Sequence, residues 1–253
     1  GMLICSRRVI PAIEWEKTLK GNGAEVAKMV EKGKSAFTGP ELMGKTLGVI
    51  GLGAIGILVA NCAVALGMDV IGFDPFMSVT NALKLNPAVK LMKSGEDVMV
   101  NCDYLTIHVP LTADTKDMVD ADMIAKMKDG VMIINTGRGQ LIHTNALIEG
   151  LKNKRIGSAG LDVYEEEAGY FYEDTSDRIM DDDVLARLLS FNNVIVTSHQ
   201  GFFTREAVDN IARTTMQNIK DFSEWDAYLA ELEKMHLEDY IAVQQAAYDR
   251  KHS

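Results

Sequence analysis

Residues 47–74 read LGVIGLGAIGILVANCAVALGMDVIGFD, and this stretch decides the fold. Residues 47–50 are an apolar run that predicts a buried parallel strand, and residues 70–73 predict a second one. Between them, residues 54–66 form an uninterrupted apolar segment without proline, which predicts a buried helix. Strand, helix and strand in this order form a βαβ unit, from which doubly wound parallel sheets are built.

Three glycines, Gly51, Gly53 and Gly56, follow the first predicted strand. In a dinucleotide-binding turn the first glycine permits the tight turn, the second lets the backbone approach a pyrophosphate, and the third lets helix and strand pack closely. The N–H groups and the positive dipole end at the helix start then hold the phosphates. Asp74 ends the second strand, 18 residues after Gly56, where a carboxylate accepts both ribose hydroxyls and repels a 2′-phosphate. The stretch therefore predicts an NAD site and disfavours NADP.

The alternation of strands and helices continues after this unit. Further strands are predicted at residues 89–92, 104–108, 131–135, 158–161 and 194–197. Helices are predicted at residues 96–100, 121–127, 144–151, 183–189 and, as one long helix, 204–222. Short connections between alternating elements predict an α/β fold, a doubly wound parallel sheet of the Rossmann type with helices on both faces.

The predicted strand ends collect residues that are far apart in the sequence. Ligands of such sheets bind beyond the carboxyl ends of the strands, so residues that follow these ends are expected to line one rim. They are residues 51–56, Asp74, Val109, Pro110, Thr136, Gly137, Arg138, Asp162 and His199.

Hydride transfer between a nicotinamide and a 2-oxo acid requires three kinds of side chain, and the sequence offers a candidate for each. Arginine pairs its planar fork with a carboxylate. Histidine delivers a proton near neutral pH, and a neighbouring carboxylate keeps the imidazole charged and oriented. The candidates are Arg138, His199 and Glu167, or a neighbour of Glu167 among Glu165 and Glu166.

Three motifs resemble the D-isomer-specific 2-hydroxyacid dehydrogenase family: NTGRGQLI at 135–142, GLDVYEEE at 160–167 and VIVTSHQGFFTREA at 194–207. The separations of 29 residues from Arg138 to Glu167 and 32 from Glu167 to His199 are similar to those of fermentative D-lactate dehydrogenases. By this resemblance Arg138 binds the substrate carboxylate, His199 is the acid/base and Glu167 is its partner. The resemblance covers roughly residues 4–222.

The same resemblance implies contacts with NAD and with the substrate. Gly51, Gly53, Gly56 and Gly137 are expected cofactor contacts, and the further matches to the family's cofactor contacts are Ala54, Ile55, Asp74, Val109, Pro110, Thr115, Thr136 and Asp162. Phe202 matches an aromatic residue near the substrate. We interpret His108 as a strand-end residue near the site and His143 as a surface residue at a helix start. The family usually has Asp where His143 stands, so a weaker helix N-cap is expected there.

The family resemblance also predicts the domain organisation. The family places about half of its substrate domain before the nucleotide domain, and we expect that lobe to be missing because CSRRVIP at 5–11 resembles the helix that crosses between the domains. The segment before residue 100 resembles 3-phosphoglycerate dehydrogenases more closely. Three parts are predicted. Residues 4–201 form an NAD-binding domain, and residues 202–222 form a helix directed to the mostly missing substrate domain. Residues 223–253 form a helical tail that weakly resembles sugar-transport binding proteins.

Composition limits the partners and the compartment. A net charge of −10 argues against nucleic acid. The sequence contains no secretory leader and no apolar run long enough to predict a membrane span. Cys5, Cys62 and Cys102 are odd in number and widely spaced, which predicts reduced thiols in a cytoplasmic protein. The acidic stretch at 162–183 lacks metal-ligand spacing, so no metal is expected.

These features predict an NAD-dependent oxidoreductase of D-2-hydroxy and 2-oxo acids, most similar to one acting on lactate and pyruvate. One alternative is 3-phosphoglycerate oxidation in serine synthesis, which requires a basic phosphate pocket; beyond Arg205 no basic cluster lies beside His199. Another is a non-catalytic NAD-binding fragment that serves only as a binding or dimerisation module. By resemblance, a homodimer through the region next to the nucleotide domain is expected.

Overall fold

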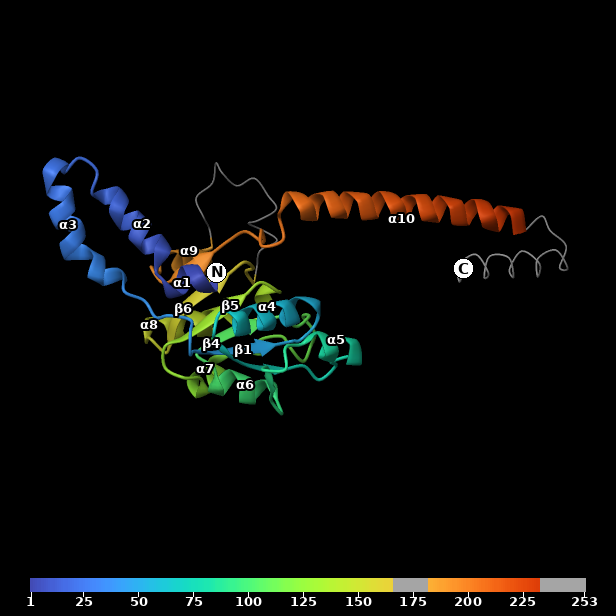
Figure 1. Ribbon diagram of the computed structural model, residues 1–253, viewed down its shortest axis with the longest axis horizontal. Coiled ribbons are helices and arrows are strands. Elements are labelled where there is room, and N and C mark those ends of the chain that lie inside the picture. The colour runs from blue at the N-terminus through green and yellow to red at the C-terminus, as the bar shows by residue number, and fades with distance from the viewer. Residues whose placement is uncertain (166–181, 233–253) are drawn as a thin grey trace. The chain divides into compact units, whose positions relative to one another are not determined.

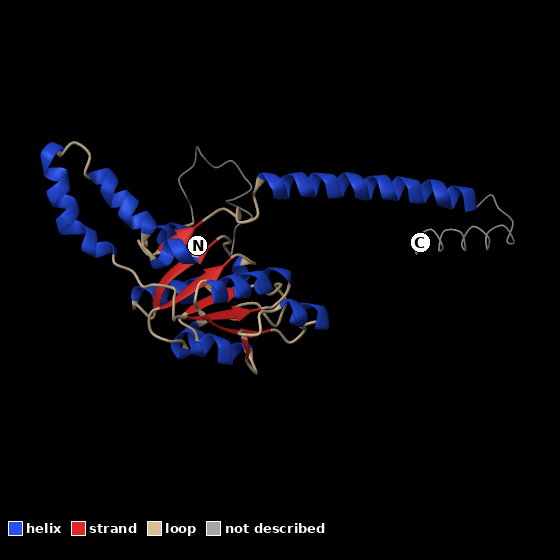
Figure 2. Cartoon of the chain, viewed as in Figure 1, coloured by secondary structure: helices blue, strands red, loops and turns tan. Residues whose placement is uncertain are grey.

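The computed structural model describes residues 1–165 and 182–232, with the helical backbone alone for 226–232. The chain divides into two compact units, Gly1–Gly201 and Phe202–Ser253. The first unit contains the sheet, and the described part of the second is mainly one long helix (Figures 1 and 2). Glu166 and Glu167, and most of the acidic stretch at 162–183, lie outside the described residues.

The described residues of the first unit form a seven-stranded sheet in the order β3-β2-β1-β4-β5-β6-β7, with neighbouring strands parallel. The chain moves outward from β1 to β3, returns to β4 beside β1, and then moves outward the other way. The predicted doubly wound sheet is thereby confirmed. The strands are β1 (Thr46–Ile50), β2 (Asp69–Phe73), β3 (Lys90–Leu91), β4 (Tyr104–Ile107), β5 (Val131–Asn135), β6 (Ile156–Leu161) and β7 (Val194–Val196).

Helices cover both faces of this sheet (Figure 1). Side chains of α1 and α4 pack in one apolar core, and those of α6, α7, α8 and α9 pack in the other. The helices are α1 (Met2–Ser6), α4 (Ala54–Ala65), α5 (Val79–Lys84), α6 (Gly95–Asn101), α7 (Ala121–Lys126), α8 (Thr144–Lys152) and α9 (Asp183–Leu189). All of these except α1 and α5 agree with the helices predicted at nearly the same bounds.

The strands form because successive side chains point to opposite faces and both faces are covered. In β1, Leu47 and Val49 belong to the core under α4, whereas Ile50 belongs to the core on the other side. In β5, Met132 likewise belongs to the core under α4 and Ile133 to the core on the other side. A strand buried on both faces needs apolar residues at consecutive positions, which explains the continuous apolar runs in the sequence.

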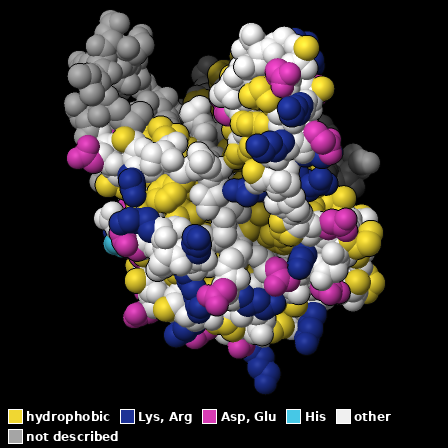
Figure 3. All heavy atoms as spheres, turned by 90° about the vertical axis from the view of Figure 1, so that its left-hand side faces the viewer, with side chains coloured by type: hydrophobic (Ala, Val, Ile, Leu, Met, Phe, Trp, Pro, Cys, Tyr) yellow, Lys and Arg dark blue, Asp and Glu magenta, His cyan; other side chains and the backbone are white. Residues whose placement is uncertain are grey.

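Between α1 and β1 lies a helical segment that the sequence analysis did not resolve. We call it the N-terminal arm and define it as residues 9–37, which contain α2 (Val9–Thr18), η1 (Gly23–Glu25), α3 (Val26–Gly33) and η2 (Lys34–Phe37). Trp15 contacts Phe37 with a ring-centroid distance of 5.2 Å, which ties α2 to η2. The arm exposes Val9, Ile10, Ile13 and Met29. Figure 3 views the side of the molecule that carries it, where hydrophobic side chains lie among charged ones.

The second unit begins at Phe202 and contains α10 (Arg205–Leu232). The helix extends ten residues beyond the predicted end at residue 222, so the described backbone has no break where the tail was predicted to begin. The predicted three-part division itself stays a prediction. No described helix is both long enough and apolar enough for a membrane crossing.

Candidate active site

The carboxyl ends of six strands stand side by side because their last residues are in register. The paired positions run from Phe73 through Ile50, Ile107, Asn135 and Leu161 to Val196. Each predicted rim residue of the first unit follows one of these ends within a few positions in the chain. The structure therefore brings them to one rim, the edge at which doubly wound sheets bind ligands.

The glycine turn follows β1. Gly51 has a φ of +89°, and a Cβ there would lie 2.7 Å from the His108 carbonyl oxygen. A Cβ at Gly56 would lie 1.9 Å from the Gly51 carbonyl oxygen. These two glycines are required by the chain's own packing. At Gly53, by contrast, a Cβ would meet nothing within 4 Å. Open space is what a phosphate approaching the backbone needs, so this position fits the role predicted for it.

Ala54 and Ile55 begin α4, and the N-cap residue, Gly53, has no side chain with which to cap this helix start. Both side chains are exposed, Ile55 by 64%. Backbone N–H groups at an uncapped helix start lack intrahelical acceptors, and the helix dipole favours an anion beside them. The first turn of α4 thus has the chemistry for a pyrophosphate.

Asp74 ends β2 and is fastened to the chain by both carboxylate oxygens. Its Oδ2 accepts the N–H of Leu52 at 2.8 Å, and its Oδ1 accepts the N–H of Phe76 at 2.8 Å. An ionised carboxylate has about four lone-pair positions, so two remain for a pair of vicinal hydroxyls. The residues present therefore fit the adenosine ribose of NAD.

β4 ends beside the glycine turn. The N–H of His108 donates to the Ile50 carbonyl over 2.7 Å, and its Nε2 lies 2.9 Å from the hydroxyl of Thr106. Burial lowers the pKa of His108 to about 4, so the imidazole is neutral near pH 7. The next residues, Val109 and Pro110, begin a turn closed by Thr115, whose hydroxyl donates to the Pro110 carbonyl over 2.7 Å.

The turn that carries Arg138 follows β5 and is held by a buried side chain. Asn135 is 1% exposed; its Nδ2 donates to the Arg138 carbonyl at 2.8 Å, and its Oδ1 accepts the N–H of Gly137 at 3.0 Å. Thr136 and Arg138 themselves are exposed. Sequence reasoning did not single out Asn135. The available signal was an amide ending an otherwise apolar buried strand, where a polar side chain must find partners.

His199 follows β7 and is partly buried, with a φ of +53°. Its N–H donates to the Asp162 carbonyl over 2.7 Å. Asp162, which follows β6, is 8% exposed and accepts from the Thr197 hydroxyl and from the N–H groups of Gln200 and Gly201. The residue that the sequence assigned to the cofactor is thus also bonded to the turn of the predicted acid/base.

The acidic partner predicted for His199 was Glu167, with Glu165 and Glu166 as neighbours. Glu167 and Glu166 lie outside the described residues. Glu165 is described, and its carboxylate accepts the hydroxyl of Thr144 at 2.7 Å at the start of α8. Phe202 belongs to the second unit, where its ring contacts Phe203 with a centroid distance of 5.9 Å.

His143 caps α8, as its position at a helix start predicts. Its Nδ1 accepts the N–H of Ala146 at 3.3 Å, a long hydrogen bond.

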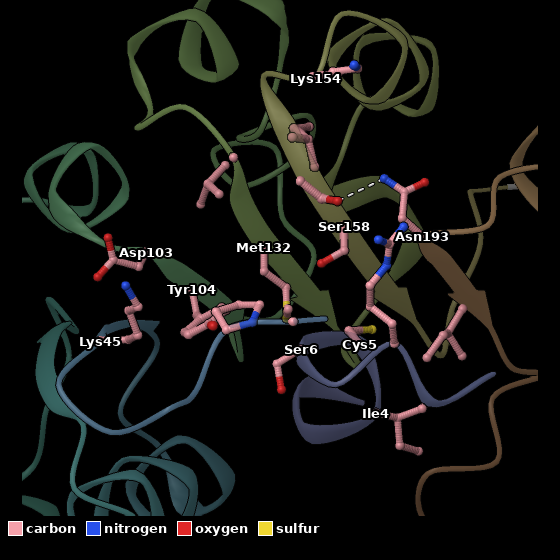
Figure 4. Close-up of a pocket in the computed structure, with 18 of the residues that line it drawn as sticks. Ile4, Cys5, Ser6, Lys45, Asp103, Tyr104, Met132, Lys154, Ser158 and Asn193 are labelled. Carbon is pink, nitrogen blue, oxygen red and sulfur yellow. Dashed lines mark hydrogen bonds between the residues drawn. The ribbon is translucent and has the colours of Figure 1, made fainter. Parts of the chain in front are cut away.

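A cavity of about 570 Å³ lies at the opposite edge of the sheet, at the amino ends of the strands. Figure 4 shows Lys45 and Asp103 on one side of it, Lys154 and Asn193 on another, and Cys5 from α1 below. Among the described residues, none of those predicted for the site lines this cavity. The cavity is therefore distinct from the rim.

A parallel sheet with a glycine turn, an open helix start and a carboxylate at the next strand end defines a dinucleotide-binding domain of the Rossmann type. Residues 2–201 match the family described as D-isomer specific 2-hydroxyacid dehydrogenase, NAD binding domain. The chain belongs to the D-isomer-specific 2-hydroxyacid dehydrogenase family, as its sequence motifs predicted.

Individual relatives agree with this assignment. An aromatic 2-oxoacid reductase of Clostridium sporogenes is 46% identical over 185 residues, which cover 73% of this chain and 54% of the relative. The D-lactate dehydrogenase of Escherichia coli K12 is 40% identical over 196 residues, covering 78% and 58%. The crystal structure of D-lactate dehydrogenase from Aquifex aeolicus, complexed with NAD and lactic acid, superimposes with a TM-score of 0.74 at 29% identity, covering 90% of this chain and 65% of that one. The chain spans about half the length of the curated relatives it matches.

Proposed function

We propose that this chain provides the NAD-binding and proton-transferring part of a dehydrogenase that interconverts D-2-hydroxy acids and 2-oxo acids. The observation that carries the proposal is the shared rim. The glycine turn, the Arg138 turn and the His199 turn follow strands whose ends are in register. This shared rim supports the proposal that the cofactor and the substrate carboxylate bind, and that the proton is delivered, at one edge of one sheet.

In this proposal the chain's residues have separate tasks in the reductive direction. Bound NADH supplies the hydride that the carbonyl carbon of the 2-oxo acid receives. Arg138 holds the substrate carboxylate through its guanidinium fork. His199 donates a proton to the carbonyl oxygen, which becomes the hydroxyl of the product. Glu167, by the family's spacing, keeps the imidazole protonated and oriented until that transfer.

The relatives' names favour two kinds of substrate. One is named for D-lactate and another for aromatic 2-oxo acids. We propose a small 2-oxo acid of the pyruvate type as the substrate, following the resemblance of the catalytic half. NADH consumption with pyruvate, phenylpyruvate and the phosphorylated 2-oxo acid formed from 3-phosphoglycerate distinguishes these two kinds of substrate from each other and from the 3-phosphoglycerate alternative.

The test of catalysis compares the wild-type chain with His199→Ala. The expected result is NADH binding by both, with turnover of a 2-oxo acid by the wild type alone. Equal turnover by the two proteins would contradict the role of His199. NADH binding without turnover by the wild type would favour the alternative, a binding module without catalysis.

We also propose a homodimer, supported by the N-terminal arm. The arm exposes Ile10 and Ile13 by 43% and 47%, and such apolar contact surface is typical of an interface. Sedimentation of wild type and Ile13→Glu tests this: a dimer that dissociates on substitution is expected, and a wild-type monomer would contradict it.

The three cysteines are unpaired, which supports the cytoplasmic location we infer.

A further inference from the structure

Asp162, which follows β6, holds the turn that carries His199 through several hydrogen bonds. Three successive N–H groups of that turn donate to Asp162: His199 to the carbonyl oxygen at 2.7 Å, Gln200 to Oδ1 at 3.0 Å and Gly201 to Oδ2 at 2.7 Å. The hydroxyl of Thr197 adds a fourth bond, 2.5 Å to Oδ1. Three of these four donors, those of Thr197, Gln200 and Gly201, bind the carboxylate, and Asp162 is 8% exposed.

The backbone conformation of the turn explains why the donors converge. His199 has a φ of +53°, in the left-handed region that residues other than glycine rarely adopt. A left-handed residue within a turn directs consecutive N–H groups into one concavity, which favours an anion. Here the anion is the Asp162 carboxylate. Hydrogen bonds from N–H groups to an ionised acceptor are among the stronger ones, so they stabilise a conformation that is otherwise unfavourable.

The packing around the carboxylate is close. A Cβ at Gly201 would lie 2.8 Å from Oδ2 of Asp162, so a larger residue there would displace the carboxylate. Asp162 is itself fixed to the sheet, because its N–H donates to the Asn135 carbonyl over 2.9 Å. The turn of His199 is therefore connected through Asp162 to the end of β5, the strand that carries the Arg138 turn.

We propose that Asp162 is a positioning residue for His199: its carboxylate holds the imidazole's turn in the conformation that places it at the rim. This role is separate from the cofactor contact expected for Asp162 from the family resemblance. It rests on the proposed function, in which His199 donates the proton. Proton transfer requires heavy-atom distances within hydrogen-bond reach, so a released turn loses catalysis even when the imidazole is present.

Three substitutions in the full chain, at Asp162 and Thr197, test the proposal, and a fourth, at Asp74, serves as control. Asp162→Asn keeps the shape, but an amide presents N–H donors where the turn also presents donors. Thr197→Val removes one hydroxyl that donates to Asp162, and Thr197→Ser restores it. Asp74→Asn is the matched control. Asp74 also accepts hydrogen bonds from backbone N–H groups, but it lies at the end of β2, away from this turn.

The first measurement is hydrogen exchange of backbone amides by NMR, which needs neither ligand nor turnover. In Asp162→Asn the amides of Gln200 and Gly201 are expected to exchange at least ~10-fold faster, because local opening no longer breaks charged hydrogen bonds. Amides of the central strand β4, such as Leu105, are expected to be unchanged, which distinguishes a local anchor from general destabilisation. Asp74→Asn is expected to leave the Gln200 and Gly201 amides as they are in wild type.

The second measurement is the kinetics of 2-oxo acid reduction. Thr197→Val is expected to lower kcat by roughly 10- to 100-fold, the scale on which small misplacements act, with the NADH dissociation constant within about twofold of wild type. Thr197→Ser is expected to recover most of the wild-type kcat. A residue serving only the fold would not give this separation of kcat from NADH affinity together with rescue by the conservative variant.

Two outcomes overturn different statements. A wild-type chain that binds NADH and turns over, with unchanged exchange at Gln200 and Gly201 in Asp162→Asn, refutes the anchor and leaves the proposed function intact. A wild-type chain that does not bind NADH refutes the proposed function, and the catalytic meaning of the anchor with it, whatever the exchange rates. Should Asp162→Asn fail to fold, Thr197→Val decides by the same two measurements.

Discussion

The N–H of Leu52 donates to the Asp74 carboxylate over 2.8 Å, so the end of β2 is fastened to the glycine turn that follows β1. The bond uses one of the carboxylate's lone-pair positions, and Phe76 uses another. The side chain that is expected to select the ribose therefore also fixes the loop expected to hold the phosphates. Two parts of the cofactor site are coupled through one residue.

Replacement of Asp74 by Ala is expected to raise the NADH dissociation constant about 10- to 100-fold, since hydrogen bonds to a charged group contribute roughly 1.5–3 kcal/mol. The discrimination against NADPH is expected to fall, because the repulsion of its 2′-phosphate is removed. Fluorescence titrations with both nucleotides measure these effects. Asp69→Ala, at the exposed start of the same strand, serves as control. An unchanged NADH affinity in Asp74→Ala would contradict the assignment.

The glycines of the turn allow a paired prediction. Gly56→Ala places a Cβ 1.9 Å from the Gly51 carbonyl oxygen, so the backbone must shift, at a cost of about 1–3 kcal/mol in unfolding free energy. Gly53→Ala meets nothing within 4 Å and is expected to cost no more than about 1 kcal/mol, the scale of an N-cap change. NADH binding by Gly53→Ala is nevertheless expected to be lost, because the methyl group occupies the phosphate approach.

Urea unfolding and NADH titration on both variants check this pair. The informative result is a stable Gly53→Ala protein that no longer binds NADH. If it bound NADH as tightly as wild type, the phosphates would have to lie elsewhere.

The partly buried His108 predicts a pH dependence of stability. Its pKa is lowered from the ordinary 6.5 to about 4 by burial, so between these values the unfolded chain binds a proton that the folded chain does not. Stability rises with pH wherever the unfolded state holds more protons, so acidification through this window removes on the order of 3 kcal/mol. Urea unfolding of wild type and His108→Asn at pH 7 and pH 4.5 measures the difference. Equal losses in the two proteins would show that His108 is not responsible.

The sheet could be predicted from the sequence because a strand buried on both faces has apolar residues at consecutive positions. β5 was predicted at residues 131–135 and found there. Once strand ends are placed, the parallel arrangement brings Asp74, Arg138 and His199 to one rim without further information.

What remained unpredicted depends on contacts between distant residues. Asp162 could be placed at a strand end, but its partners Thr197 and Gly201 lie 35 and 39 residues further along the chain. Sequence patterns report local periodicity and carry no sign of which donors meet a carboxylate. The arm was missed for another reason: α2 and α3 contain no buried residue, so they lie outside the cores of the sheet, whose apolar runs made the other elements predictable.

Replacement of His143 by Asp is expected to stabilise the first unit by about 0.5–1 kcal/mol, since Asp is a better N-cap and its charge favours the positive end of the α8 dipole. The present cap bond, from the N–H of Ala146 to Nδ1, is 3.3 Å long. Denaturant midpoints followed by circular dichroism measure the change. As a control, Asp120→Ala removes the 2.8 Å cap bond of α7 and is expected to destabilise by a similar or larger amount. No gain in His143→Asp would mean that this cap does not limit stability.

Asn135 connects the fold to substrate binding, since its buried amide holds the turn of Arg138 from both sides. Asn135→Leu leaves the N–H of Gly137 and the carbonyl of Arg138 without these partners, at a cost of about 1–3 kcal/mol in unfolding free energy. With the turn loosened, KM for the 2-oxo acid is expected to rise, and the NADH dissociation constant is expected to rise with it, because Thr136 in the same turn is an expected cofactor contact. Arg138→Lys is the matched variant: it keeps both Asn135 bonds of the turn, loses only the exposed bond from Arg138 Nη1 to the Gly137 carbonyl, and replaces the bidentate fork with a point charge. KM is therefore expected to rise with little loss of stability. A rise in KM for Arg138→Lys together with a normal KM for Asn135→Leu would show that the guanidinium finds the substrate without the support of this turn.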